Sequence, residues 1–145
     1  MLSASLGRYQ ILESLGRGGM GEIYLAEDPA LGRKVAIKML PAEFRSDADR
    51  RNRLIHEARA ASALNHPNIC TIYEIAKYQG QTFIAMEFLD GMTLAHRVAG
   101  RPLDIEPLLS LAIEIADALD VAHAARLVDN PQGRKRAMRR FTDTS

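Results

Sequence analysis

Three strand-like segments follow one another so closely that no helix fits between them. Each is rich in residues that favour strands, and they cover residues 9–16, 21–28 and 34–40. Turn-forming residues separate them, with Gly18 and Gly19 in the first gap and residues 29–32 in the second. Parallel neighbours need a long crossover connection, so this spacing predicts an antiparallel sheet.

A helix and two further strands are predicted next. Leu54, Ala58, Ala61 and Leu64 recur at helical spacing within residues 47–64, and Asn65-His66-Pro67 ends the pattern. Residues 69–77 and 82–88 then have strand character, with a turn at residues 78–80.

A long helix is predicted from Asp104, a good N-cap, to about Arg126. Pro107 falls in its first turn, where proline is tolerated. Apolar residues recur along one face of this helix at Leu108, Ala112, Ile115, Leu119 and Ala122. The order of elements predicts an α+β fold, with a five-stranded antiparallel sheet, one helix against it and a long helix after it.

The first candidate site is the segment from Gly16 to Ile23, which has the pattern G-x-G-x-x-G-x-I. Glycines let the backbone approach phosphate oxygens and offer N–H groups to them. Glycine-rich hairpins also occur for structural reasons alone, so the pattern does not decide by itself. A dinucleotide site needs a helix after the glycines, whereas here a strand continues, as in the nucleotide loop of kinases.

Two charged residues complete the candidate site. Strand alternation places Ala36 and Lys38 of Val35-Ala36-Ile37-Lys38 on the same face, where a lysine can reach phosphates. The alternative is a solvated strand lysine. Glu57 has apolar helical neighbours, which predicts that it lies on the buried stripe and needs a cationic partner such as Lys38. The alternative is a slightly rotated helix with a solvated Glu57.

These motifs together resemble the protein kinase family, and in particular bacterial serine/threonine kinases of eukaryotic type. The resemblance covers about residues 7–128 and includes His66-Pro67-Asn68-Ile69 and residues 83–94. It implies a kinase small lobe at residues 9–89 after a lead of residues 1–8. It also implies the hinge exit and first helices of a truncated large lobe at 90–128.

The resemblance implies an ATP site in the small lobe. Lys38 would pair with Glu57 and touch the α- and β-phosphates. Met86 would be the gatekeeper, and Cys70 would lie behind the pocket as a small buried hydrophobe. The remaining implied nucleotide-binding residues are Leu15, Gly16, Gly18, Gly19, Gly21, Ile23, Ala36, Glu87 and Leu89, the last two through backbone groups at the hinge.

The chain departs from the family after Val128. Asp129 stands where the family has the histidine of His-Arg-Asp, Arg134 stands at the position five beyond it, and no Asp-Phe-Gly occurs. The ligands that hold Mg²⁺ and the catalytic carboxylate are therefore absent, which predicts nucleotide binding without catalysis by the chain alone, as in a pseudokinase. We assign no metal to the protein itself.

Composition sets the remaining expectations. Residues 129–145 carry five basic and two acidic side chains, which predicts a basic, disordered tail. The net charge of +1 does not favour a nucleic-acid partner, and no apolar run is long enough to cross a membrane. The single cysteine and the absence of a signal peptide predict a cytoplasmic protein. The alternative function is a non-catalytic module that binds a partner kinase or another protein through an exposed helix.

Overall fold

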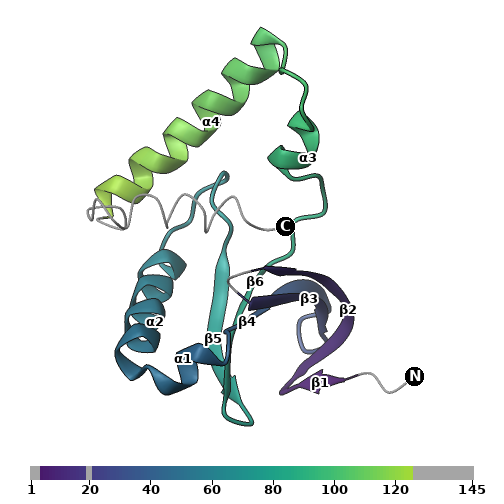
Figure 1. Cartoon of the computed structure of the whole chain (residues 1–145), viewed down its shortest axis with the longest axis vertical. Coiled ribbons are helices and arrows are strands. Elements are labelled where there is room, and N and C mark those ends of the chain that lie inside the picture. The colour runs from purple at the N-terminus through teal and green to yellow at the C-terminus, as the bar shows by residue number, and fades with distance from the viewer. Residues whose placement is uncertain (1–3, 19–20, 126–145) are drawn as a thin grey trace. The chain divides into compact units, whose positions relative to one another are not determined.

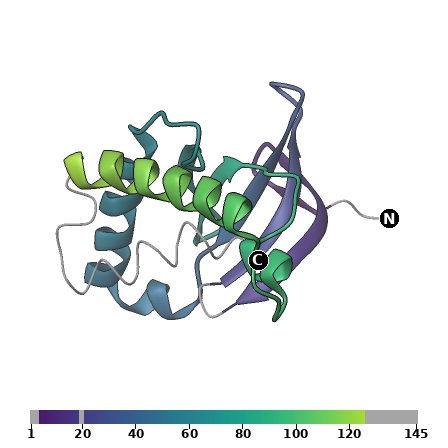
Figure 2. The same cartoon turned by 90° about the horizontal axis from the view of Figure 1, so that it is seen from above.

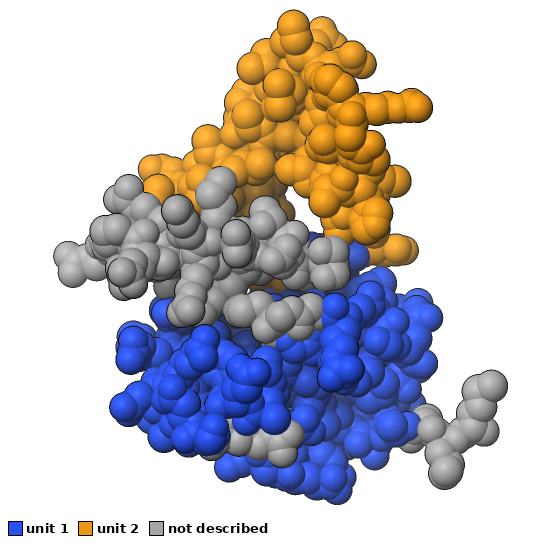
Figure 3. All heavy atoms as spheres, viewed as in Figure 1, with its two compact units in different colours: residues 1–63, 71–89 blue, residues 64–70, 90–145 orange. Residues whose placement is uncertain are grey.

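The computed structural model describes residues 4–18 and 21–125 (Figure 1, and from above in Figure 2). Gly19 and the predicted basic tail lie outside these described residues. The chain divides into two compact units, coloured in Figure 3. The first unit comprises residues 1–63 and 71–89, and the second comprises residues 64–70 and 90–145.

An antiparallel sheet forms the first unit, as the short connections predict. Its strand order is β1-β2-β3-β4-β6-β5, and every neighbouring pair is antiparallel. Figure 2 shows that the sheet is strongly twisted, as expected from the right-handed twist of individual strands. The strands are β1 (Ser5–Leu6), β2 (Tyr9–Gly18), β3 (Gly21–Asp28), β4 (Arg33–Met39), β5 (Ile72–Tyr78) and β6 (Gln81–Glu87).

The described sheet has six strands, one more than predicted. Strand β1 consists of two residues that pair with the start of β2, Ser5 with Gln10 and Leu6 with Tyr9. Two residues are too short to show a period-two pattern, so sequence periodicity cannot detect such a strand.

Helix α2 (Ala48–Ser62) follows a single-turn helix, α1 (Glu43–Ser46), and lies alongside β5 (Figure 1). The side chain of Asp47 caps its start, because Oδ1 accepts the Arg50 N–H at 3.0 Å. Leu54, Ala58 and Ala61 are buried, which confirms these three positions of the predicted apolar stripe. The fourth, Leu64, lies beyond the end of the helix and is half-buried.

The core of the first unit is built on one face of the sheet. Its buried residues are Tyr9, Ala26, Val35, Ile37, Phe83 and Ala85. The rings of Tyr9 and Phe83 meet edge to face, with centroids 5.9 Å apart and planes at 87°. This group, here called the core cluster, ties strands β2, β3, β4 and β6 together.

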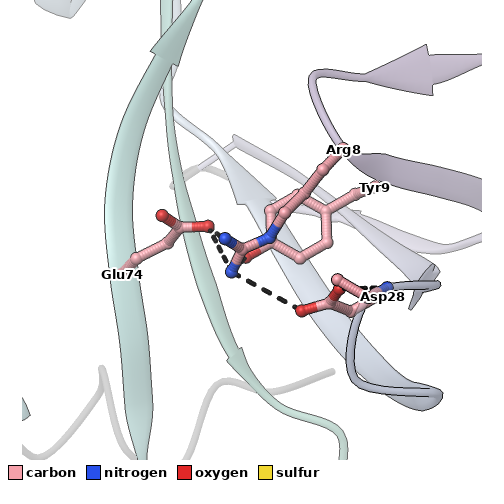
Figure 4. Close-up of polar contacts among 5 residues, drawn as sticks. Arg8, Tyr9, Asp28 and Glu74 are labelled. Carbon is pink, nitrogen blue, oxygen red and sulfur yellow. Dashed lines mark hydrogen bonds and ion pairs between the residues drawn. The ribbon is translucent and has the colours of Figure 1, made fainter.

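A polar group at the edge of this core cluster joins three strands (Figure 4). Asp28 is fully buried, and a buried carboxylate is costly unless it is paired. Its Oδ1 accepts the Ala30 N–H at 3.1 Å, and its Oδ2 lies 3.5 Å from Arg8 Nη2. At that distance the Arg8 contact is an ion pair, because Oδ2 has no hydrogen-bond donor among the described residues.

Glu74 completes the polar group. Arg8 Nη2 lies 3.1 Å from Glu74 Oε1, and the Tyr9 hydroxyl donates a hydrogen bond to the same oxygen. Burial, and then the hydrogen bond to Glu74, raises the pKa of Tyr9 to about 12. Tyr9 therefore keeps its proton to a higher pH than a free tyrosine does. Its hydrogen bond to Glu74 holds the start of β2 against β5.

In the second unit, His66 connects the segment 64–70 to helix α4 (Ile105–Ala124). The Asn68 N–H donates to His66 Nδ1 at 3.1 Å, so the proton of a neutral ring lies on Nε2. His66 Nε2 lies 3.0 Å from Asp117 Oδ2 and donates to it, and Asn68 Nδ2 donates to the Glu114 carbonyl at 3.4 Å. These contacts give His66 a structural role.

Helix α4 exposes much of its apolar surface. It begins after Asp104, whose side chain makes no capping hydrogen bond, and a short helix, α3 (Leu94–Val98), precedes it. Within this fully described helix, Ala122 is the buried residue. Its exposed large apolar side chains are those of Ile105, Leu108, Leu109, Ile113 and Ile115.

Candidate functional site

The glycine-rich segment forms the hairpin between β2 and β3. Gly16 pairs with Ile23, and Gly18 pairs with Gly21, so strands flank the glycines on both sides. A dinucleotide fingerprint needs a helix after the last glycine, and the observed strand excludes that alternative.

Gly21 is fixed in a conformation that other residues rarely adopt. Its φ is +112°, and a Cβ at this position would lie 2.0 Å from the carbonyl oxygen of Met39. The last glycine of the motif therefore allows β3 to begin in direct contact with the end of β4. This reason is local packing and is independent of any ligand.

Four predicted site residues share one face of the sheet. The register pairs Ile23 with Lys38 and Ala36 with Met86. Alternation places all four opposite the core cluster, since their neighbours Val35 and Ile37 belong to that cluster. Ile23, Ala36 and Met86 are buried, and Lys38 is half-buried. This arrangement places a lysine beside three apolar side chains.

The prediction that Glu57 lies on the buried stripe of its helix is wrong. Glu57 is exposed, although the adjacent Ala58 is buried. The buried positions 54, 58 and 61 define a narrow stripe, and position 57 falls at its edge, outside the apolar contacts of the helix. The pairing of Glu57 with Lys38 stays a prediction.

Two predicted residues at the ends of the site are exposed. Leu15 lies where the register between β2 and β3 shifts, and 41% of its surface is accessible. Leu89 follows β6 and is 56% exposed.

Glu87 at the end of β6 is anchored to Thr71. Its N–H donates to the Thr71 carbonyl at 2.8 Å, and its Oε2 accepts the Thr71 N–H at 3.2 Å. The Glu87 side chain therefore points to the start of β5. Sequence reasoning did not anticipate this contact.

Three linked side chains on the glycine hairpin were also missed. Arg17 Nε lies 3.2 Å from Glu22 Oε1, and the Tyr24 hydroxyl donates to Glu22 Oε2. This hydrogen bond to the carboxylate is the largest cause that raises the pKa of the Tyr24 hydroxyl. The hairpin register would have revealed the group, because Arg17 and Glu22 are direct cross-strand partners.

The described residues offer no metal-binding cluster of three or more His, Cys, Asp or Glu side chains. Cys70 is partly exposed, whereas the sequence suggested a buried residue. Within the part of the chain that the structure describes, no helix has the length and apolar character needed to cross a bilayer.

Comparison with known proteins agrees with this geometry. The family described as protein kinase domain matches residues 9–129. The chain is 42% identical over 123 residues to the serine/threonine-protein kinase PrkC of Bacillus subtilis. That match covers 84% of this chain and 19% of PrkC. The chain is also 39% identical over 115 residues to the serine/threonine-protein kinase PknJ of Mycobacterium tuberculosis. This second match covers 79% of this chain and 20% of PknJ.

A solved structure has the same fold. The kinase domain of Mycobacterium tuberculosis PknI superposes with a TM-score of 0.76 at 30% sequence identity. The match covers 84% of this chain and 50% of the PknI chain. The chain thus spans about a fifth of the curated relatives and half of this solved domain.

An antiparallel sheet with a glycine hairpin, a strand lysine on its inner face and a helix beside it defines the small lobe of a protein kinase. The chain belongs to the protein kinase domain family, and it corresponds to a fragment of a bacterial serine/threonine kinase of eukaryotic type.

Proposed function

We propose that the chain binds ATP through its small lobe. The supporting observation is the register that sets Ile23 beside Lys38 and Ala36 beside Met86 on one face, under a glycine hairpin. An apolar surface suits a flat base, and a half-buried ammonium next to it suits phosphate oxygens. Lys38 would contact the α- and β-phosphates and Glu57 would orient it, as in the family.

The other predicted residues complete the nucleotide site. Leu15, Ile23 and Ala36 would form the roof over adenine, with Met86 behind it. The backbone of Glu87 and Leu89 would bind the base edge. Because the Glu87 N–H already donates to Thr71, a contact from the Glu87 backbone would have to use its carbonyl.

We propose further that the chain alone does not transfer phosphate. The sequence has no His-Arg-Asp or Asp-Phe-Gly, which in kinases supply the catalytic carboxylate and the ligands of Mg²⁺. ATP binding is therefore the function that this part of a kinase supports. We propose that the protein is cytoplasmic.

Thermal unfolding with and without ATP tests the proposal. A ligand that binds only the folded state stabilises it, and ATP at ten times its Kd would contribute about 1.4 kcal/mol. For a domain of this size we expect the midpoint to rise by a few degrees, roughly 2–6 °C. The measurement is the unfolding midpoint by circular dichroism over a series of Mg-ATP concentrations.

Two controls accompany this experiment. MgCl₂ at matched ionic strength should leave the midpoint unchanged, since neither ion recognises the site. Incubation with labelled ATP and a generic serine/threonine substrate should transfer no label. A midpoint that does not respond to millimolar Mg-ATP would reject ATP binding, and transfer that disappears in Lys38→Met would reject the inactive state.

A second candidate function is binding of another protein through α4. Its support is the exposed apolar surface of this helix, with Ile105 73% and Ile113 68% accessible. Light scattering after size exclusion should show an assembly that Ile113→Lys disperses. A monomer that captures no partner kinase would exclude this function.

A further inference from the structure

The outer face of the glycine hairpin carries a connected group of three side chains. Arg17 on β2 and Glu22 on β3 lie directly opposite each other, with Arg17 Nε 3.2 Å from Glu22 Oε1. The second carboxylate oxygen of Glu22 accepts the Tyr24 hydroxyl. One carboxylate thus joins both strands of the hairpin. We call Arg17, Glu22 and Tyr24 the hairpin clamp.

The clamp is anchored in the body of the sheet. The ring of Tyr24 packs against the core cluster, and Tyr24 is half-buried. Arg17 at the other end has a side chain that is 82% exposed. The connection therefore runs from the rigid core, through Glu22, to the strand that leads to the hairpin tip.

The clamp and the proposed nucleotide site lie on opposite faces of β3. Alternation places Glu22 and Tyr24 on one face and Ile23 on the other. The clamp side chains therefore do not contact a bound base themselves, although Ile23 between Glu22 and Tyr24 belongs to the proposed roof over adenine. This separation makes the clamp a positioning element and not a direct ligand.

The hairpin needs such an element because of its composition. Gly16, Gly18 and Gly21 lie in or next to its tip, and glycine loses more conformational freedom on ordering than any other residue. Backbone N–H groups bind phosphate well only when they are already oriented toward it. Any contact that orders the glycine hairpin before the ligand binds therefore increases the affinity of the hairpin for phosphate.

We propose that the hairpin clamp positions the glycine hairpin for the triphosphate of ATP. This inference rests on the proposed ATP site and adds residues outside it. The clamp holds β2 and β3 together next to Gly16, Gly18 and Gly21, so it strengthens binding of the phosphates more than binding of the nucleoside. Its removal weakens ATP binding more than adenosine binding.

Removing the hydroxyl of Tyr24 is the most specific way to test the clamp. Tyr24→Phe removes the hydrogen bond to Glu22 but keeps the ring in the core and changes no charge. We expect the Kd for Mg-ATP to rise about threefold to fivefold, as loss of one hydrogen bond in a partly exposed network predicts. The Kd for adenosine should rise less than twofold, because the clamp side chains lie on the opposite face of β3 from the proposed base site.

Tyr78→Phe is the matched control, because Tyr78 packs against the same core cluster and lies away from the hairpin, on β5. It should change neither Kd. Equal weakening of ATP and adenosine by Tyr24→Phe would mean a general loss of packing and would overturn the proposal, as would an unchanged Kd for ATP.

The direction in which a second variant changes the Kd for ATP distinguishes the clamp from simple electrostatics. Glu22→Ala removes a negative charge near the proposed triphosphate, so Coulomb attraction alone predicts tighter ATP binding. The clamp predicts weaker binding. Exchanging the charges in an Arg17→Glu/Glu22→Arg double variant should recover part of the affinity that each single variant loses.

The two proposals fail in different ways. If the wild-type chain binds neither ATP nor adenosine, the ATP site and the clamp's role both fall. If the wild-type chain binds ATP but Glu22→Ala binds it more tightly, only the clamp is rejected.

Discussion

Replacing Gly21 by alanine lowers the free energy of unfolding of the first unit by about 2–4 kcal/mol, which is the expected size for a strained backbone plus a steric clash. The added methyl would lie 2.0 Å from the Met39 carbonyl oxygen, a backbone atom that cannot move without disturbing β4. The φ of +112° adds strain for any residue with a Cβ. Urea unfolding followed by circular dichroism measures the loss.

Gly32→Ala is the control for this substitution. Gly32 also has a positive φ, +62°, but nothing lies within 4 Å of the position of its Cβ. It should lose only about 1 kcal/mol, the usual cost of a left-handed alanine. Equal losses at both positions would show that conformational strain, and not contact with β4, requires glycine at position 21.

Replacing Lys38 by methionine should remove most of the response to ATP. Methionine has a similar length and fills the half-buried position, but it offers no charge to phosphate oxygens. Hydrogen bonds to charged groups contribute about 1.5–3 kcal/mol, so the Kd for Mg-ATP should rise roughly 10- to 100-fold. The thermal shift at a fixed ATP concentration should then nearly vanish.

Lys34→Met tests whether this effect is specific. Lys34 lies on the same strand and is exposed near its start, opposite Glu27 in the register. Its loss should leave ATP binding unchanged, and both variants should unfold near the wild-type midpoint without ligand. An ATP response that survives in Lys38→Met would place the phosphates elsewhere.

The sheet could be predicted because its signals are local. Strands β2, β3 and β4 are rich in strand-forming residues, and glycines or a proline mark each turn. Alternation also fixed the shared face of Ala36 and Lys38, which the register of β4 with β3 and β6 confirms. That Ile23 lies beside Lys38 and Met86 beside Ala36 could be known only from the observed pairing of the strands.

Other features depend on short elements or on distant contacts. Strand β1 and helices α1 and α3 contain two to five residues, too few for any period to appear. The exposure of Glu57 depends on how helix α2 is rotated, which its spacing defines only to within part of a turn. The link between His66 and Asp117 joins residues 51 positions apart, and only folding reveals it.

The pairing of β3 with β4 also determines where the chain can tolerate extra residues. Adding a single residue within β4 ahead of Lys38 would turn its ammonium to the side on which Ile37 is fully buried, and would leave a charge in an apolar interior. Residues 29–32 form an exposed turn outside the paired region, so a longer loop there preserves the alignment on both sides. Peptide tags or reporter loops are therefore best grafted at this turn, where they leave Lys38 on the face of the proposed nucleotide site.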